Sequence, residues 1–403
     1  TGKSIVSQSL VKDSQMHNFI FSVPTTVYFG KGQLTSLSKA MHPLGTKVLV
    51  VTGRGSTIRN GILAKVKCAL SDFQLTELSG VDPNPRVTTV RKGVELCREK
   101  GIEVILAVGG GSVIDCAKAI AAGVYYDGDP WNMVLNSAKG SITKALPVCT
   151  VLTLAATGSE MDGAAVISNV DTNEKFTMLS PLLIPKVSIM DPEFTYSVPA
   201  PQTAAGSADI LSHIMEVYFG DENTYMTDRI SEALMKTVIR FAPVAMTRPD
   251  DYEARANLMW ASSWAINGLT AAGKAHDWSC HYIEHELSAF YDITHGVGLA
   301  IITPQWMRYI LNEKTLDKFS AFARNVWGID GSLPKYEQAK RGIEELENFF
   351  RLLKLPNKLS SLGIDDRHFA EMAEHANKTT GIGSASYVPL SSKSIENILK
   401  MCL

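Results

Sequence analysis

The chain has 403 residues, which exceeds a typical domain of about 150 residues and predicts two domains. Hydrophobic residues make up 45% and charged residues 20%, the balance of an ordinary globular protein. A formal net charge of −2 provides no strong field, which excludes attraction to nucleic acid or an anionic membrane through bulk charge.

The segment from Met16 onward is typical of a native start, so residues 1–15 are interpreted as a remnant or extension outside the fold. The six cysteines form no C-x-x-C pair and no disulfide framework, which favours a reducing cytoplasm. We find no secretory signal and no apolar run that could span a bilayer.

From residue 47 the chain alternates short β-rich runs with helical stretches. Predicted strands are 47–51, 73–78 and 103–108, followed by strands within 147–160 and 186–192. Predicted helices are 58–71, 86–100 and 113–126. This alternation predicts an α/β domain with a doubly wound parallel sheet over residues 16–197.

The pattern changes in the proline-containing stretch 196–206, beyond which helical periodicity dominates. Predicted helices lie within 208–219, 229–242, 254–269, 339–355 and 367–378. Residues 198–403 are therefore predicted to form an all-helical domain, with a ligand cleft between the two domains.

A strand, a glycine run and a helix follow one another in "ILAVGGGSVIDCAK". Because Gly109, Gly110 and Gly111 carry no side chain, the backbone can approach a pyrophosphate, which the helix N-terminus would attract. Ser112 belongs to the same turn. The run is not G-x-G-x-x-G, and a tight turn without ligand is the alternative.

A second strand-turn-helix candidate contains Gly53, Arg54, Gly55 and Ser56. NAD sites commonly place an acid near the ribose hydroxyls, and this turn has none. A 2′-phosphate could instead meet Arg54 or Arg59, which favours NADP over NAD. The alternative is an ordinary surface arginine in a turn.

Four of the nine histidines fall in "HDWSCHYIEHELSAFYDITHG": His276, His281, His285 and His295. His281 and His285 are four residues apart and share a helix face. Upstream, Asp209 and His213 are also four residues apart. A carboxylate and an imidazole at this spacing can hold one cation together.

We therefore predict a site of three nitrogens and one oxygen from Asp209, His213, His281 and His295. Four ligands close a tetrahedral zinc site, whereas Fe2+ accepts further ligands and stays open to substrate, with Zn2+ as a competitor. The alternatives are hydrogen-bonded buried histidines and an acid near a helix start.

The sequence resembles the iron-containing (group III) alcohol dehydrogenase family, from about Phe21 to near the C-terminus. The resemblance rests on "DPNP" (82–85), "GGGSVID" (109–115), "ATGSE" (156–160), "DILSH" (209–213) and the histidine segment. The "HDW…H…HEL" pattern is most similar to the branch of NADPH-dependent butanol dehydrogenases and aldehyde reductases. The family resemblance implies a homodimer with the dehydroquinate synthase-like architecture.

The resemblance also implies roles for single residues. Asp209, His213, His281 and His295 match the metal ligands, and His285 matches a nearby histidine that relays protons. Residues that match cofactor-binding positions are Gly53, Ser56, Asn84, Gly109, Gly110, Gly111, Ser112, Asp115, Thr153, Leu154, Thr157 and Lys175. Gly53 stands where NAD-using members often carry aspartate, which again favours NADP.

Some neighbouring residues are assigned without a ligand role. His276 is expected near the cleft, with packing as the alternative, and Cys280 is read as packing. Four aromatic residues could line a hydrophobic pocket, although each is more often core: Trp260, Trp264, Phe290 and Tyr291.

The predicted reaction is hydride transfer between NADP(H) and an aldehyde or primary alcohol of butanol type. A bound ion polarises the carbonyl, and His285 or water supplies a proton. One alternative is a dehydroquinate synthase-like lyase that uses NAD and zinc, disfavoured because no basic cluster surrounds the histidines. The other is a non-catalytic scaffold of the same fold.

Overall fold

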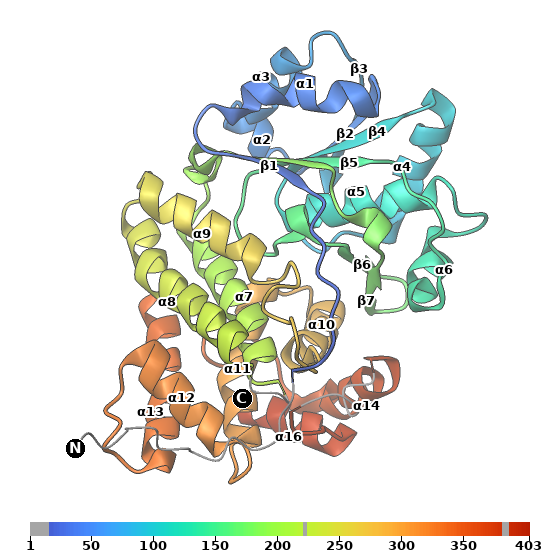
Figure 1. The fold of residues 1–403 in the computed structure, drawn as a ribbon. Coiled ribbons are helices and arrows are strands. Elements are labelled where there is room, and N and C mark those ends of the chain that lie inside the picture. Colours follow the sequence, from blue (N-terminus) through green and yellow to red (C-terminus); the bar gives the residue numbers. More distant parts are fainter. Residues whose placement is uncertain (1–15, 221–223, 381–386) are drawn as a thin grey trace.

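The computed structural model describes residues 16–220, 224–380 and 387–403. A six-stranded parallel sheet forms the upper part of the molecule, and a helical bundle forms the lower part (Figure 1). The order across the sheet is β1-β8-β5-β4-β2-β3. These strands are β1 (Thr26–Phe29), β2 (Lys47–Gly53), β3 (Gln74–Val81), β4 (Val104–Gly109), β5 (Val148–Leu152) and β8 (Val187–Met190).

The two faces of the sheet are buried by different helices, as the unbroken apolar strands require. Val48 and Val50 of β2 face one side, where they pack in one cluster with residues of α1 (Leu37–Met41) and α3 (Ile62–Ala69). Leu49 and Val51 face the other side, in a cluster with residues of the next three helices. These are α4 (Val87–Lys100), α5 (Gly111–Gly123) and α6 (Pro130–Leu135).

Two local features of this domain differ from the sequence prediction. The helix expected over 58–71 is interrupted at Gly61, which has φ +77° and separates α2 (Ser56–Arg59) from α3. An antiparallel hairpin, β6 (Ala164–Asn169) and β7 (Glu174–Leu179), was not predicted. Its tip holds Asn173 at φ +50°, a conformation that asparagine tolerates.

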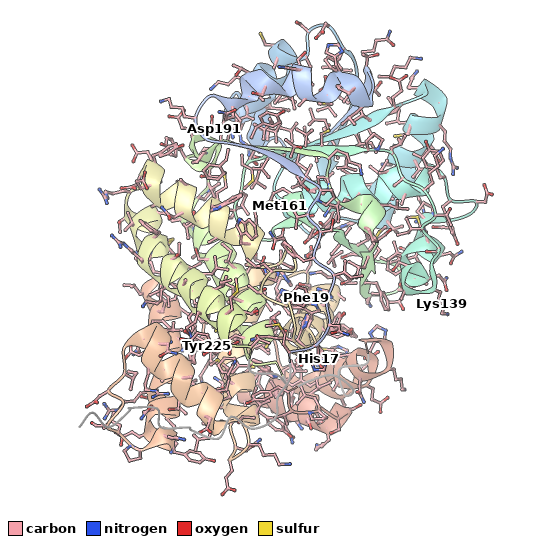
Figure 2. All side chains as sticks on the ribbon, in the orientation of Figure 1. His17, Phe19, Lys139, Met161, Asp191 and Tyr225 are labelled. Atoms are coloured by element: carbon pink, nitrogen blue, oxygen red, sulfur yellow. The ribbon has the colours of Figure 1, made fainter. Side chains whose placement is uncertain are left out.

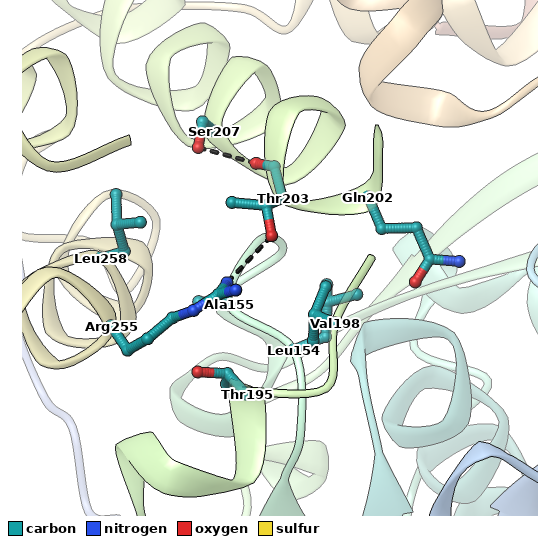
Figure 3. Close-up of a pocket in the computed structure, with 9 residues that line it drawn as sticks. All are labelled: Leu154, Ala155, Thr195, Val198, Gln202, Thr203, Ser207, Arg255 and Leu258. Atoms are coloured by element: carbon teal, nitrogen blue, oxygen red, sulfur yellow. Dashed lines mark hydrogen bonds between the residues drawn. The ribbon is translucent and has the colours of Figure 1, made fainter. Parts of the chain in front are cut away.

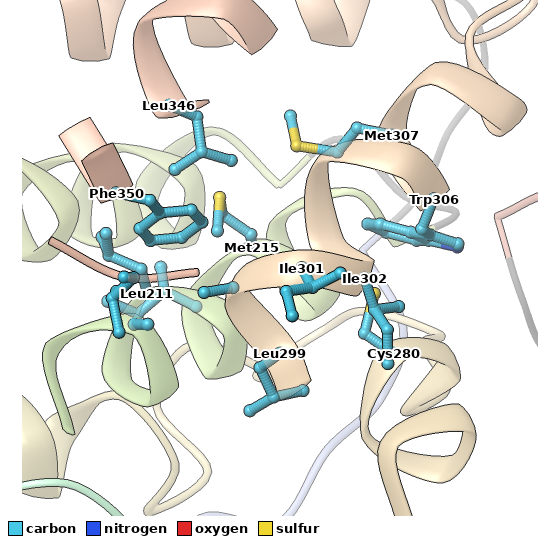
Figure 4. Close-up of a cluster of buried hydrophobic side chains, with 14 of the residues drawn as sticks. Leu211, Met215, Cys280, Leu299, Ile301, Ile302, Trp306, Met307, Leu346 and Phe350 are labelled. Carbon is cyan, nitrogen blue, oxygen red and sulfur yellow. The ribbon is translucent and has the colours of Figure 1, made fainter. Parts of the chain in front are cut away.

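The helical domain follows β8. Its helices in the described residues are α7 (Ala200–Tyr218), α8 (Tyr225–Thr247), α9 (Tyr252–Trp264), α10 (Ser279–Tyr291), α11 (His295–Ile310), α12 (Leu316–Trp327), α13 (Lys335–Leu352), α14 (Phe369–Thr380) and α16 (Ser392–Met401). One apolar core joins them, in which Leu211 and Met215 of α7 meet Leu299 of α11 and Phe350 of α13 (Figure 4).

The segment before β1 runs along the helical domain, where Figure 2 shows His17 and Phe19. The His17 N–H donates to the Gly273 carbonyl at 3.1 Å. Among the described residues, no helix combines the length and apolar character needed to cross a membrane.

Candidate metal and cofactor site

A cavity of about 940 Å³ lies between the two domains. Its lining includes these predicted residues of the α/β domain: Asn84, Ser112, Asp115, Thr157 and Lys175. The helical domain contributes Asp209, His213, His276, His281, His285 and His295. The predicted cleft therefore exists, and the predicted metal ligands face it.

Three imidazoles surround one carboxylate oxygen of α7. Asp209 Oδ1 lies 3.4 Å from Nε2 of His213, 3.4 Å from Nε2 of His281 and 3.7 Å from Nε2 of His295. The ligand atoms of Asp209, His281 and His295 all lie within 4.8 Å of one another. His213 is outside that trio but stacks on His281, with ring centroids 4.6 Å apart.

The close approach of α11 to α7 explains how residues far apart in sequence converge here. A Cβ on Gly296 would stand 2.0 Å from the Ala205 carbonyl oxygen, so only glycine fits at this crossing. His295 precedes this glycine and begins α11, which places its Nε2 3.7 Å from Asp209 Oδ1 in the middle of α7.

The residues present fit a divalent transition metal. Asp209 Oδ1 and His281 Nε2 are buried and have no hydrogen-bond partner among the described residues. Such orphaned groups are costly unless something binds them. Around an ion with bonds of about 2.0–2.1 Å, ligand atoms sit about 3.0–3.4 Å apart. The distances of 3.4–3.7 Å from Asp209 Oδ1 to the three Nε2 atoms are close to this spacing.

Two glutamates that the sequence reasoning missed orient the ligating rings. Glu216 Oε1 lies 2.5 Å from Nδ1 of His281, and the other oxygen accepts the Cys280 N–H at 2.8 Å. Glu284 Oε2 is paired with Nδ1 of His295. A carboxylate on the distal nitrogen fixes the tautomer and turns Nε2 toward the metal.

Burial and mutual charge set the protonation states of this cluster. Burial would raise the pKa of Asp209, but His213 and the other two rings hold it well below its ordinary value. Burial lowers the pKa of His213. His285 has its pKa lowered by burial first and then by Lys175, so its imidazole is neutral.

A polar chain joins the metal cluster to the α/β domain across the cleft. Lys175 Nζ on β7 lies 3.5 Å from Glu284 Oε2 and donates to Asn84 Oδ1 at 3.1 Å. Asn84 in turn donates to Asp292 at 2.8 Å. The hairpin therefore supplies a buried cation that links a predicted cofactor-contacting residue to the glutamate behind His295.

The glycine run forms a tight turn at the carboxyl end of β4. A Cβ on Gly110 would meet Leu154 at 3.2 Å, and one on Gly111 would meet Thr157 Oγ1 at 2.1 Å. The turn thus packs against the loop after β5, and the start of α5 presents its first N–H groups at the turn.

Asp115 supports this turn from behind. It accepts from Ser159 Oγ at 2.6 Å and from the Val166 N–H at 2.9 Å. Burial raises its pKa to about 6, against the opposing influence of Lys118. Both oxygens of Asp115 accept hydrogen bonds from within the protein, which favours a role in positioning the loop.

Seven predicted cofactor residues lie outside the cavity lining, namely the three glycines of the run (Gly109, Gly110 and Gly111) and Gly53, Ser56, Thr153 and Leu154. Gly53 ends β2, and Ser56 begins α2. The Thr153 N–H donates to the Gly109 carbonyl at 3.0 Å, and Leu154 lines a separate small cavity (Figure 3). Arg54, expected to be available for a 2′-phosphate, is instead paired with Asp82 at the end of β3.

His276, Cys280 and the four aromatic residues considered for a hydrophobic pocket differ in their relation to the cavity. His276 lines the cavity beside Trp278, with ring centroids 5.3 Å apart, and burial lowers its pKa. Cys280 is fully buried in the helical core, as expected of a packing residue. The cavity lining in the described residues does not include Trp260, Trp264, Phe290 or Tyr291.

Comparison with known families identifies the chain. Residues 24–192 match the family described as "Iron-containing alcohol dehydrogenase", and residues 203–403 match "Fe-containing alcohol dehydrogenase family, C-terminal". The chain belongs to the iron-containing alcohol dehydrogenase family. The predicted family, fold class and enzyme class, an NAD(P)-dependent alcohol dehydrogenase, are confirmed.

Individual relatives cover nearly the whole chain. NADH-dependent butanol dehydrogenase A of Clostridium acetobutylicum is 51% identical, with 96% of this chain and 99% of that protein aligned. NADPH-dependent aldehyde reductase YqhD of Escherichia coli is 38% identical over 87% of this chain and 90% of its own. The crystal structure of NADH-dependent butanol dehydrogenase A from Thermotoga maritima superposes with a TM-score of 0.92 at 38% identity, covering 96% and 99% of the two chains.

Proposed function

We propose that this protein transfers hydride reversibly between a nicotinamide cofactor and a short primary alcohol or its aldehyde, of the butanol type. The observation that carries the proposal is the placement of three imidazole Nε2 atoms within 3.4–3.7 Å of Asp209 Oδ1, at the wall of the interdomain cavity. When bound there, Fe2+ supplies Lewis-acid polarisation of the substrate oxygen, worth several kcal/mol. Asp209, His213, His281 and His295 are the proposed ligands.

The remaining residues of the site bind and orient the reactants. We assign His285 to proton transfer, because a neutral imidazole in the cavity can accept and return one proton. Ile142, Leu179 and Ile266 in the lining offer apolar contacts that suit a short alkyl chain. The start of α5 offers N–H groups to the cofactor pyrophosphate.

For the nucleotide, we propose NADH, in place of the NADP favoured by sequence. Gly53 is paired with Val81 across the sheet, so Asp82 lies beside the turn that lacks an acid of its own. This carboxylate would repel a 2′-phosphate and engages Arg54, which therefore offers the phosphate little net attraction. The 51%- and 52%-identical butanol dehydrogenases are both named NADH-dependent, which supports the same choice.

The decisive experiment is elemental analysis of the purified protein, paired with butanal reduction assays using NADH and NADPH. We expect about one iron or zinc per chain and net oxidation of NADH with a higher kcat/KM than of NADPH. The His281→Ala variant should lose metal and turnover together. A dehydroquinate synthase-like lyase would show no net cofactor oxidation, and a scaffold protein would retain no metal.

A cytoplasmic homodimer is part of the same proposal. It rests on the cysteine pattern and on the family resemblance, and light scattering during gel filtration tests the dimer.

A further inference from the structure

Asp292 occupies a position that its own helix disfavours. It directly follows α10 and has φ +50°, in the left-handed region that glycine adopts most easily at the end of a helix. Its carboxylate also lies at the negative end of the helix dipole, where cations are favoured over anions. Local preferences would place glycine, asparagine or a basic residue here, which indicates that the carboxylate serves a partner outside α10.

That partner is Asn84, across the cleft in the α/β domain. Asn84 Nδ2 donates to Asp292 Oδ1 at 2.8 Å, a contact between residues 208 positions apart. Arg86, in the same loop between β3 and α4, is held less closely. Its Nη2 lies 3.7 Å from Asp292 Oδ2, whereas its Nε lies 3.2 Å from a carboxylate oxygen of Asp82. The hydrogen bond to Asn84 is therefore the closer contact that Asp292 makes across the cleft.

The side-chain amide of Asn84 has its orientation fixed from two sides. Lys175, on β7 beside α10 (Figure 1), can only donate, and its Nζ donates to Asn84 Oδ1 at 3.1 Å. A carboxylate can only accept, and Asp292 accepts from Nδ2. Both partners thus require the same orientation of the amide.

One N–H group of this amide is left for a ligand. An amide nitrogen carries two N–H groups, and within the described ranges Asp292 is the one acceptor bound to Asn84 Nδ2. Asn84 is buried, yet it lines the interdomain cavity. The neighbouring Pro83 carbonyl accepts from Ser112 Oγ, which ties this loop to the turn where we place the cofactor pyrophosphate.

We propose that Asp292 is a positioning residue for the nucleotide and acts through Asn84. It holds one N–H of the Asn84 amide and leaves the other for a ribose hydroxyl or phosphate oxygen. The inference rests on the proposed function, because it requires a nicotinamide nucleotide at the glycine run. It adds that the helical domain helps to recognise the nucleotide through a residue that is outside the cavity lining in the described part of the chain.

Replacement of Asp292 by glycine separates this role from a structural one. Asp292→Gly removes the acceptor where glycine suits the backbone, so the Tm without nucleotide should not fall. The Kd of NADH should rise about 10-fold, the usual scale for losing a hydrogen bond to a charged group. Asp292→Asn tolerates the same φ and keeps an accepting oxygen, so its Kd should stay within about 3-fold of the wild type.

Isothermal titration calorimetry of the purified holoenzyme measures these Kd values, with NADPH in place of NADH if the wild type binds it more tightly. A double-mutant cycle then tests whether Asp292 acts through Asn84. Asn84→Ala alone should weaken binding, and adding Asp292→Gly should weaken it no further. Lys354→Gly is the matched control, because Lys354 is exposed, has φ +61° and follows the end of α13. It should bind the nucleotide as the wild type does.

Failure of this inference can be told apart from failure of the proposed function. A wild type that binds neither nucleotide would overturn both. A wild type that binds the nucleotide no better than Asp292→Gly would overturn the positioning role alone, and so would additive losses in the double variant. A Kd for Asp292→Asn as weak as that for Asp292→Gly would assign the effect to the charge that faces Arg86, which would also overturn it.

Discussion

Glu216 Oε1 lies 2.5 Å from Nδ1 of His281, on the side of the ring opposite Asp209. The same glutamate accepts the N–H groups of Cys280 and His281 at 2.8 Å and 3.3 Å, which anchors it to the start of α10. Ser212 Oγ donates to it at 2.9 Å. Ser212 and the start of α10 thus fix the buried carboxylate that contacts the His281 ring.

We therefore predict that Glu216→Gln weakens metal binding about 10- to 100-fold, the usual cost of removing a carboxylate behind a ligating histidine. The amide keeps the shape of the side chain but loses the charge that fixes the tautomer of His281. Competition with a chelator, followed by metal analysis, measures the change. The exposed Glu374→Gln on α14 is the matched control, and an unchanged dissociation constant in Glu216→Gln would refute the role.

Sequence spacing was sufficient to group the proposed ligands but not to complete the site. Asp209 and His213 share a helix face at four residues apart, and the histidine segment is conspicuous in composition. Glu216 lies three residues after His213, and Glu284 lies three residues after His281. That spacing was a usable signal, although acidic residues on helices are too common for it to be specific.

Other features depended on contacts that no local pattern reveals. Asp82 reaches Arg54 only because β2 and β3 are neighbours in the sheet, which brings residues 28 positions apart together. The β6–β7 hairpin is short and half-buried. The role of its Lys175 depends on an ion pair with Glu284 of the helical domain, which no local pattern in the sequence indicates. The hydrogen bond from Asn84 to Asp292 likewise forms only because the two domains meet at the cleft.

The packing of Gly111 leads to a second prediction. Gly111 is the first residue of α5, and the Cβ of an alanine there would meet Thr157 Oγ1 at 2.1 Å. We expect Gly111→Ala to lower the free energy of unfolding by about 1–3 kcal/mol and to raise KM for the nucleotide. Denaturant titration and steady-state kinetics measure these two effects.

Gly53→Ala is the control for that substitution. An added Cβ there would find its nearest atoms at 3.7 Å and 3.8 Å, which is ordinary contact. It should therefore unfold at the denaturant concentration of the wild type. Equal stability of the two variants would show that the glycine run is not constrained by Thr157.

A third prediction concerns the choice of nucleotide. Replacing Asp82 with asparagine removes the carboxylate beside Gly53 and frees the charge of Arg54. The ratio of kcat/KM for NADPH to that for NADH should rise roughly 10-fold, because a 2′-phosphate would meet a net positive charge. Asp127→Asn, an exposed surface change, should leave the ratio unaltered, and so would Asp82→Asn if this strand end were remote from the ribose.

The last prediction concerns Glu160, a carboxyl group buried between the two domains. Ser263 Oγ of α9 donates to Glu160 Oε1, and Ser188 Oγ donates to its carbonyl at 2.7 Å. Burial raises its pKa from 4.5 to about 7, against the opposing hydrogen bond from Ser263. Between those two pH values the folded state holds a proton that the unfolded state has released.

The free energy of unfolding should therefore fall as pH rises through this window, by about 3 kcal/mol from this group once it is fully ionised. Glu160→Gln, which stays neutral, should lack this part of the slope and should be more stable than the wild type at pH 8. Urea titrations at a series of pH values measure the difference between the two proteins, which cancels the contributions of other buried acids. The exposed Glu77→Gln variant is the control and should reproduce the wild-type slope. If Glu160→Gln and the wild type showed the same pH dependence, Glu160 would ionise as freely in the folded protein as in the unfolded chain, and the prediction would be wrong.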